Sequence, residues 1–194
     1  MLKSTNCSDC LEERLDVSSS TFTDLGYDDS VTYLDGTSLR GDVSTERICV
    51  TTDLASCATA QAFVALTQAD GLSDYEDGIL GLWSGNRDGY NDFEMLMPGL
   101  YDDDVISEQT FSFYLTGLSG TSYIDFGPID TSLVTDTDQI LWMDIIDDDY
   151  WWTQKVTGFR WDGDEAEYAI YEMNGITDTG SSCLIGPSAY IDLV

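Results

Sequence analysis

Short apolar runs separated by glycine and aspartate recur along the 194-residue chain. The runs are rich in valine, isoleucine, threonine and tyrosine, which fit the pleated, half-buried surface of a β-strand. No apolar run is long enough to cross a membrane, and no sequence repeat of fixed short period is present. Hydrophobic residues make up 42% of the chain and aromatic residues 12%. A chain with this apolar content is not expected to be disordered. The pattern therefore predicts a globular all-β protein.

A first hairpin is predicted from two short strands, 31–34 and 37–40, that flank Asp35 and Gly36. The Asp-Gly pair is typical of a two-residue turn, because both central residues of such a turn need a positive φ and both residue types tolerate it. We therefore expect Asp35 and Gly36 to form the tip of this hairpin.

A second hairpin and one helix complete the predicted elements. Residues 111–115 alternate as a half-buried strand, and a glycine-containing turn leads into the strand 123–126. Apolar residues share one face of a helix over 92–97, and Pro98 and Gly99 are expected to end it.

The chain is strongly acidic, with 37 Asp and Glu residues against 7 Lys and Arg residues and no histidine. A net charge of −30 repels nucleic-acid phosphates and anionic lipid heads, so neither nucleic acid nor a membrane is an expected partner. An acidic compartment would relieve the self-repulsion, and high external salt is the alternative. The aspartate runs 102–104 and 147–149 are interpreted as solvated loops, with calcium binding as the alternative.

Five cysteines indicate an oxidising compartment. Cys7 and Cys10 are near neighbours, as are Cys49 and Cys57, and we expect both pairs to form local disulfides. A zinc site is the alternative for these four, but the spacing matches zinc sites poorly and no histidine is available. Cys183 remains, and we expect it to be a buried free thiol, because no histidine can activate it.

The segment 176–187 carries the clearest candidate chemistry. Asp178 follows an apolar strand and sits in a loop of small residues, Thr179, Gly180 and Ser181. Gly180 allows close backbone approach, and the neighbouring hydroxyls can donate hydrogen bonds to the carboxylate. The alternative is a structural Asx turn between two strands.

This loop resembles the second catalytic loop of pepsin-like aspartic proteases, Asp-Thr-Gly-Ser/Thr-Ser followed by apolar residues and Gly-Pro. Further stretches resemble family segments in the same order. They are Tyr33 with Asp35-Gly36-Thr37, 77–82, 111–115, 124–130 and 149–152. The resemblance implies a bilobal fold with double-psi barrel lobes, in which 1–110 belong to the N-terminal lobe and 111–194 to part of the C-terminal lobe. The family's strand at 77–82 lies at the active site of the first lobe.

The resemblance also implies a mechanism and its residues. Asp178 would act as acid or base opposite a second carboxylate, and Thr179, Gly180 and Ser181 would shape its loop. No metal or other cofactor is expected. The expected partners are protein or peptide substrates, and the protein is expected to be a monomer that is secreted or held in a lysosome-like acidic compartment.

The segment Tyr33, Asp35, Gly36 and Thr37 resembles the flap that closes over substrate, with Tyr33 as the flap tyrosine. A tyrosine that only packs on a hairpin is the alternative. The first Asp-Thr-Gly of the family is not found, so we expect a chain that is incomplete at both ends and inactive alone. A non-catalytic relative that keeps the cleft, or an acidic surface protein of a halophile, are the competing interpretations.

Overall fold

The computed structural model confirms an all-β chain. Its described residues are 1–4, 7, 15–73, 76–83, 95–117, 119–134, 136–146, 151–159 and 168–188. Over these residues the regular elements are eight strands, one α-helix and three short 3₁₀-helices, Leu54–Ser56, Thr131–Leu133 and Thr137–Gln139. The strands form one four-stranded and two two-stranded sheets. The double-psi barrels implied by the resemblance remain a prediction.

Contacts divide the chain into two compact units. The first unit comprises 1–82 and 91–135, and the second comprises 83–90 and 136–194. The predicted lobe boundary between residues 110 and 111 falls within the first unit and remains a prediction about the family's two lobes. No helix among the described residues is long and apolar enough to span a membrane.

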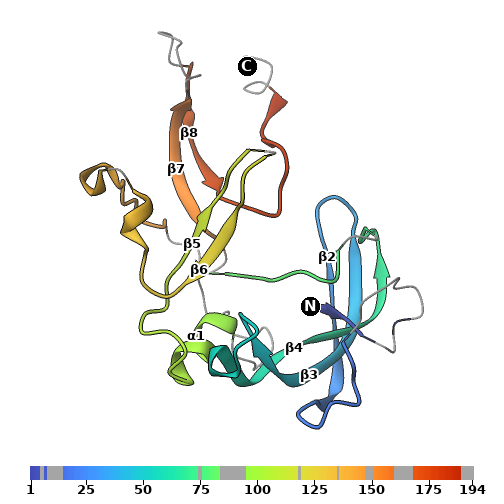
Figure 1. Cartoon of the computed structure of the whole chain (residues 1–194). Coiled ribbons are helices and arrows are strands. Elements are labelled where there is room, and N and C mark those ends of the chain that lie inside the picture. Colours follow the sequence, from blue (N-terminus) through green and yellow to red (C-terminus); the bar gives the residue numbers. More distant parts are fainter. Residues whose placement is uncertain are drawn as a thin grey trace. The chain divides into compact units, whose positions relative to one another are not determined.

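The main sheet of the first unit has the strand order β1-β4-β3-β2 (Figure 1). These strands are β1 (Leu2–Lys3), β2 (Thr23–Thr32), β3 (Ser38–Cys49) and β4 (Cys57–Asp70). β3 pairs antiparallel with both β2 and β4, whereas β1 pairs parallel with β4. A disulfide joins Cys49 to Cys57, at the connection between β3 and β4, as predicted.

The hairpin of β2 and β3 is confirmed, but its turn differs from the expected one. Thr32 pairs with Ser38, and the amide of Gly36 donates to the carbonyl of Tyr33 over 3.0 Å. Gly36 has a φ of 94°, whereas Asp35 does not have a positive φ. The prediction of a two-residue turn is therefore wrong. The connection is longer, and glycine alone takes the left-handed position, as in turns that end in a glycine bulge.

A first hydrophobic core lies on β3 and β4. Leu39, Val43, Val64 and Leu66 are almost completely buried and contact one another. Alternating residues of a strand point to the same face, so the period of two along each strand places these side chains together. Gly41 lies where the register of this pairing shifts. Glycine is required there, because a Cβ atom would meet the β4 backbone at 2.1 Å.

The helix lies further along the chain than predicted. α1 spans Leu96–Asp102, so Pro98 and Gly99 are part of it and do not end it. Pro98 is tolerated because the amides of the first helical turn have no partner within the helix. The other half of the prediction, 92–94, lies outside the described residues. A second core surrounds the helix; its buried residues are Ala58, Leu96, Met97, Leu100 and Ile106.

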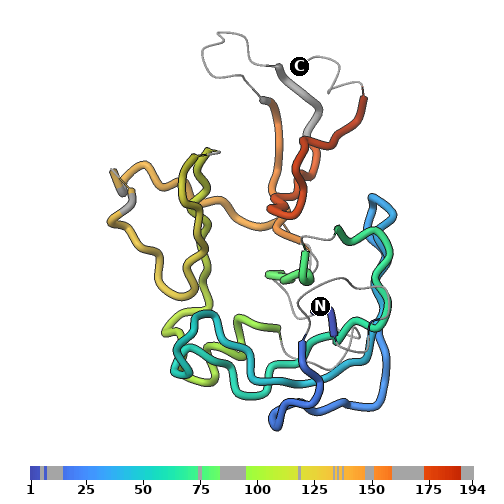
Figure 2. Tube along the Cα trace, turned by 45° about the vertical axis from the view of Figure 1, so that its right-hand side comes forward, coloured from blue at the N-terminus to red at the C-terminus, as the bar shows by residue number. Residues whose placement is uncertain are grey.

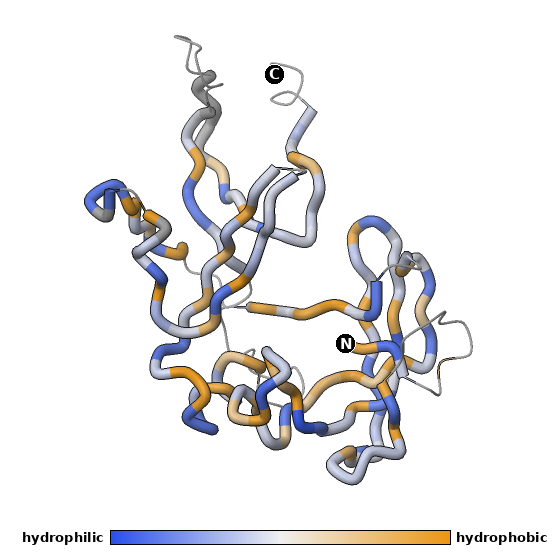
Figure 3. The backbone as a smooth tube through the Cα atoms, viewed as in Figure 1, coloured by the Kyte–Doolittle hydropathy of each residue, from blue (hydrophilic) through white to orange (hydrophobic). Residues whose placement is uncertain are grey.

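The predicted strand at 77–82 is represented by one bridge and three backbone hydrogen bonds to the start of the chain. Lys3 N donates to Asp77 O over 2.9 Å, and Ile79 N donates to Met1 O over 2.9 Å. Gly78 is required, since a Cβ atom there would meet Met1 O at 2.2 Å. This segment runs beside β1 and passes from hydrophilic to hydrophobic residues (Figure 3).

In a 194-residue chain that starts at Met1, the terminal ammonium is predicted to make stability depend on pH. It donates to the carbonyl of Ile79 over 2.8 Å, and burial lowers its pKa from 8.0 to about 6. Between these values the unfolded chain binds more protons, so stability rises with pH, by about 2 kcal/mol between pH 6 and pH 8. The chain has no histidine to mask this effect.

Urea unfolding of the 194-residue chain at several pH values measures this change. An acetylated amino group cannot titrate, so the acetylated chain should show a flat profile over the same window. A flat profile for the unmodified chain would contradict the prediction.

Two further hairpins follow along the chain, and only the first of them was predicted from the sequence. β5 (Phe111–Tyr114) pairs with β6 (Tyr123–Phe126) in the first unit, which confirms the second predicted hairpin. β7 (Thr153–Phe159) pairs with β8 (Tyr168–Ile176) in the second unit. Figure 2 shows β7 in orange, and the end of β8 in red with the segment that follows it.

The predictions for the other three cysteines had different outcomes. Cys7 is fully buried and takes part in a disulfide, but Cys10 lies outside the described residues, so the predicted pair is not described. Cys183 is a free thiol, as expected, but it is exposed. The expectation of burial is wrong, because residues 184–187 lie outside any strand and do not cover it.

Two aspartate runs were expected to be solvated. Residues 102–104 are exposed, but Asp103 also accepts a hydrogen bond from Thr59 N over 2.6 Å, which ties the end of α1 to β4. The run 147–149 lies outside the described residues.

Candidate active site

The flap turn, defined here as residues 33–37, is a closed loop of backbone and side-chain hydrogen bonds. Tyr33 N donates to Thr37 O over 2.8 Å. Both oxygens of Asp35 accept from Thr37, one from its amide over 2.9 Å and one from its hydroxyl over 3.0 Å. Thr37 is buried, whereas Leu34 at the tip is fully exposed. The sequence-predicted flap residues therefore form one structured turn.

Tyr33 is half-exposed on this turn. Burial of the phenol raises its pKa, and the nearby Asp35 carboxylate raises it further. Both effects favour the neutral phenol, which can donate a hydrogen bond. The position of Tyr33 is compatible both with the flap role and with a packed aromatic, so the flap role stays a prediction.

The Asp178 loop follows β8 in the second unit. Asp178 Oδ1 accepts from Gly180 N over 2.9 Å, and Oδ2 accepts from Ser181 Oγ over 2.6 Å. A Cβ atom on Gly180 would lie 3.2 Å from Oδ1, so only glycine leaves the carboxylate ample room. Gly180 and Ser181 thus both donate to the carboxylate, and the catalytic-loop role of Thr179, Gly180 and Ser181 stays a prediction.

Thr177 ties this loop to the start of β7, in part through Gln154, which the sequence analysis did not indicate. Thr177 Oγ1 donates to Gln154 Oε1 over 3.0 Å, and Thr177 N donates to Trp152 O over 3.0 Å. The pairing of Thr153 with Ile176 brings them together. Only the register of β7 with β8 places Gln154 beside Thr177, and no local sequence pattern reports that register.

The turn geometry of Asp178 does not by itself identify a catalytic residue. Asp35, Asp53 and Asp130 also accept a hydrogen bond from the amide two residues later. This is the Asx turn that was the structural alternative. The hydroxyl hydrogen bond from Ser181 to the second oxygen does not distinguish Asp178 either, because the Asp35 carboxylate accepts one from Thr37 and Asp130 also bonds to the side chain of Ser132.

Asp178, Thr179, Gly180 and Ser181 are exposed, and so are residues 182–188 that follow them. Leu184 and Ile185 are more than 80% exposed. A carboxylate with two donors and an open side can accept a further hydrogen bond from water. Apolar side chains this exposed beside it are typical of a surface that another segment covers.

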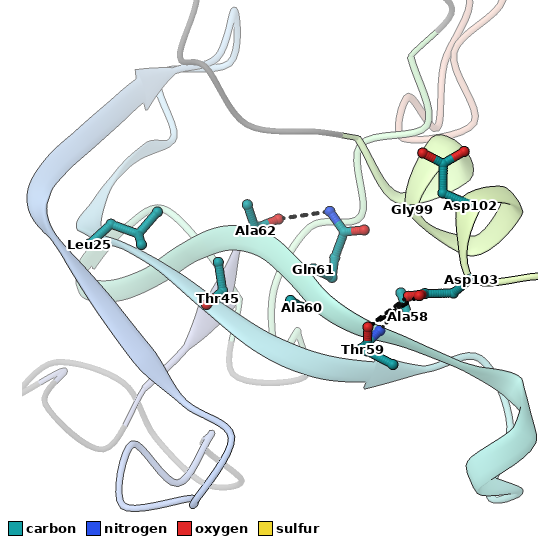
Figure 4. A pocket seen from close by; sticks show the side chains of 10 residues that line it. All are labelled: Leu25, Thr45, Ala58, Thr59, Ala60, Gln61, Ala62, Gly99, Asp102 and Asp103. Carbon is teal, nitrogen blue, oxygen red and sulfur yellow. Dashed lines mark hydrogen bonds between the residues drawn. The ribbon is translucent and has the colours of Figure 1, made fainter.

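The first unit also has a shallow groove of about 340 Å³ between β4, β2 and the end of α1 (Figure 4). Ala60 and Gln61 of β4 line it, with Leu25 on one side and Asp102 and Asp103 on the other. It contains none of the sequence-predicted site residues. Among the described residues no cluster of three His, Cys, Asp or Glu side chains could hold a metal ion.

The chain is similar to known proteins over most of its length. The family model for eukaryotic aspartyl proteases matches residues 2–194. The chain is 34% identical over 118 residues to gastricsin from Cavia porcellus, a match that covers 59% of this chain and 29% of that protein. It is 29% identical over 150 residues to gastricsin from Callithrix jacchus, covering 69% of this chain and 36% of the relative. The chain thus spans about a third of the length of these relatives.

Proposed function

We propose that this chain, which belongs to the eukaryotic aspartyl protease family, carries one catalytic half of an aspartic endopeptidase, with Asp178 as its catalytic carboxyl group. The match of the family model to residues 2–194 is the observation that carries the proposal. The hydrogen bonds from Gly180 and Ser181 support it, because they hold the Asp178 carboxylate in a defined orientation.

The proposed chemistry needs a second carboxylate opposite Asp178. Two carboxylates held close together share one proton, because like charges at such a distance cannot both ionise. The ionised group takes a proton from a bound water molecule, and that water attacks the peptide carbonyl. The protonated group donates to the carbonyl oxygen. Which of the two steps Asp178 performs depends on where the shared proton lies.

Asp-Thr-Gly occurs once in the sequence, at Asp178. The opposing carboxylate therefore comes from a segment outside these 194 residues, and the chain alone lacks hydrolytic activity. Tyr33, Asp35, Gly36 and Thr37 form the flap that lies over bound substrate and excludes water from the reaction. The substrates are proteins or peptides, and the working compartment is acidic and oxidising, either outside the cell or lysosome-like.

The single Asp-Thr-Gly also favours a second candidate, a non-catalytic family member that binds peptides without cleaving them. The two candidates share the flap and the Asp178 loop and differ in the presence of the second catalytic loop. The residues that precede Met1 in the transcript would distinguish them.

Hydrolysis of a denatured globin substrate at about pH 3 to 5, where a shared-proton dyad works, tests the proposal. The 194-residue chain should show none. The chain extended by the upstream residues of its transcript should be active and be blocked by a statine-type transition-state mimic. An extended chain that binds the mimic without hydrolysing substrate would support the non-catalytic candidate. Hydrolysis by the isolated chain that survives Asp178→Asn would refute the site.

A further inference from the structure

A second loop lies directly against the flap turn. This buttress loop, residues 71–73, follows the end of β4. The hydroxyl of Thr37 lies 3.5 Å from the carbonyl oxygen of Gly71. A Cβ atom on Gly71 would meet the Thr37 hydroxyl at 2.9 Å and its Cα atom at 3.0 Å. Gly71 also has a φ of +87°, so glycine is required both by its backbone conformation and by this contact.

Thr37 connects this loop to the flap tip. Its side chain is buried, and its hydroxyl lies between the Asp35 carboxylate, over 3.0 Å, and Gly71. Because the Thr37 amide also donates to Asp35, the position of Thr37 determines where the Asp35 carboxylate lies. Asp35 in turn raises the pKa of the Tyr33 phenol, together with burial. The three residues are therefore coupled through short contacts.

The buttress loop is itself held to the main sheet. Lys3 of β1 is 3% exposed, and its ammonium donates to Ser73 O over 3.4 Å. Ser73 N donates to Glu76 over 2.8 Å, and the hydrogen bonds from the backbone and side chain of Ser73 lower the pKa of Glu76. The charge of Asp35 opposes that lowering, so Glu76 lies within electrostatic reach of the flap turn.

We infer that Thr37 is a positioning residue, which holds the flap turn against Gly71 of the buttress loop and so sets the placement of Asp35 and Tyr33. The inference rests on the proposed function only in calling residues 33–37 a flap. The contacts themselves do not depend on catalysis. Opening of the turn requires Thr37 to leave Gly71, so the buttress loop controls the flap from its base. In the peptidase, this contact regulates how readily the flap opens over a peptide.

Two pairs of variants in the 194-residue chain test the inference. Thr37→Val removes the hydroxyl at similar volume, and Thr37→Ser retains it. Gly71→Ala adds a Cβ atom against Thr37, whereas Gly26→Ala, at a φ of +80°, adds one with no atom within 4 Å. Both alanine variants carry the same strain of a positive φ, so only the contact with Thr37 distinguishes them.

The readouts are amide hydrogen exchange at Gly36 and Thr37 and the pKa of Tyr33, assigned by comparison with Tyr33→Phe. Thr37→Val and Gly71→Ala should accelerate exchange at the turn about tenfold, as expected for a lost hydrogen bond to a charged group. The pKa of Tyr33 should fall toward its ordinary value. Thr37→Ser and Gly26→Ala should leave both readouts at the turn unchanged.

Equal behaviour of Gly71→Ala and Gly26→Ala would overturn the inference, as would equal behaviour of Thr37→Ser and Thr37→Val. Acceleration spread evenly over the core amides of Val43 and Leu66 would also overturn it, because general destabilisation would then explain the result. These readouts need no substrate. A failure of the hydrolysis assay would refute the proposed function and leave this result standing.

Discussion

The Asp178→Asn variant of an active protein that contains this chain is expected to hydrolyse peptide bonds at least about 10³-fold more slowly, the scale of a lost general acid or base. An amide accepts the hydrogen bonds of Gly180 and Ser181 through one oxygen only and cannot exchange a proton with water. The loop therefore keeps its backbone course, while the proton-transfer step fails.

Asp130→Asn is the matched control for this variant. Asp130 is followed by threonine and accepts a hydrogen bond from Ser132 N over 2.9 Å, so it has the same Asx turn as Asp178. The Asp130→Asn variant should retain activity, because the turn at Asp130 has only a structural role. Initial rates on a peptide substrate, with unfolding curves for both variants, provide the measurement. Comparable losses in the two variants would mean that the turn geometry, and not the Asp178 carboxyl group, determines activity.

Leu66→Ala is expected to lower the free energy of unfolding by about 2 to 5 kcal/mol, the range for leucine truncation in a packed core. Leu66 is completely buried and packs with Leu39, Val43 and Val64. It also pairs with Lys3 of β1 on one side and Gly41 of β3 on the other, so a cavity there weakens both strand pairings.

Leu54→Ala is the control for this stability change. Leu54 is 69% exposed in a short 3₁₀-helix, and its truncation should change stability by no more than about 0.5 kcal/mol. Urea unfolding of the three chains gives the difference directly. A loss at Leu66 as small as that at Leu54 would show that the cores of this chain are loosely packed.

Several elements could be predicted because their signals are local. The alternation around residues 31–40 and 111–126 indicated both hairpins, and the pairings of β2 with β3 and of β5 with β6 agree. The cysteine pair at residues 49 and 57 also followed from short spacing. In each case the interacting residues are close in sequence, so the pattern itself contains most of the information.

The errors have specific physical causes. Pro98 was interpreted as a helix terminator, yet in the first turn of α1 its missing amide costs no hydrogen bond. Asp35 was assigned a positive φ, but the turn has one more residue and only Gly36 takes that conformation. Cys183 was expected to be buried by a following strand, and residues 184–187 do not form one.

By itself the sequence determined the strand-rich class and the two hairpins, because their signals come from residues that are close together in the chain. The role of the Asp178 loop stays a prediction. Tertiary structure alone decided the contacts of Thr37 with Gly71 and of Met1 with Ile79. Those residues are 34 and 78 positions apart, and only the register of the sheet brings them within reach.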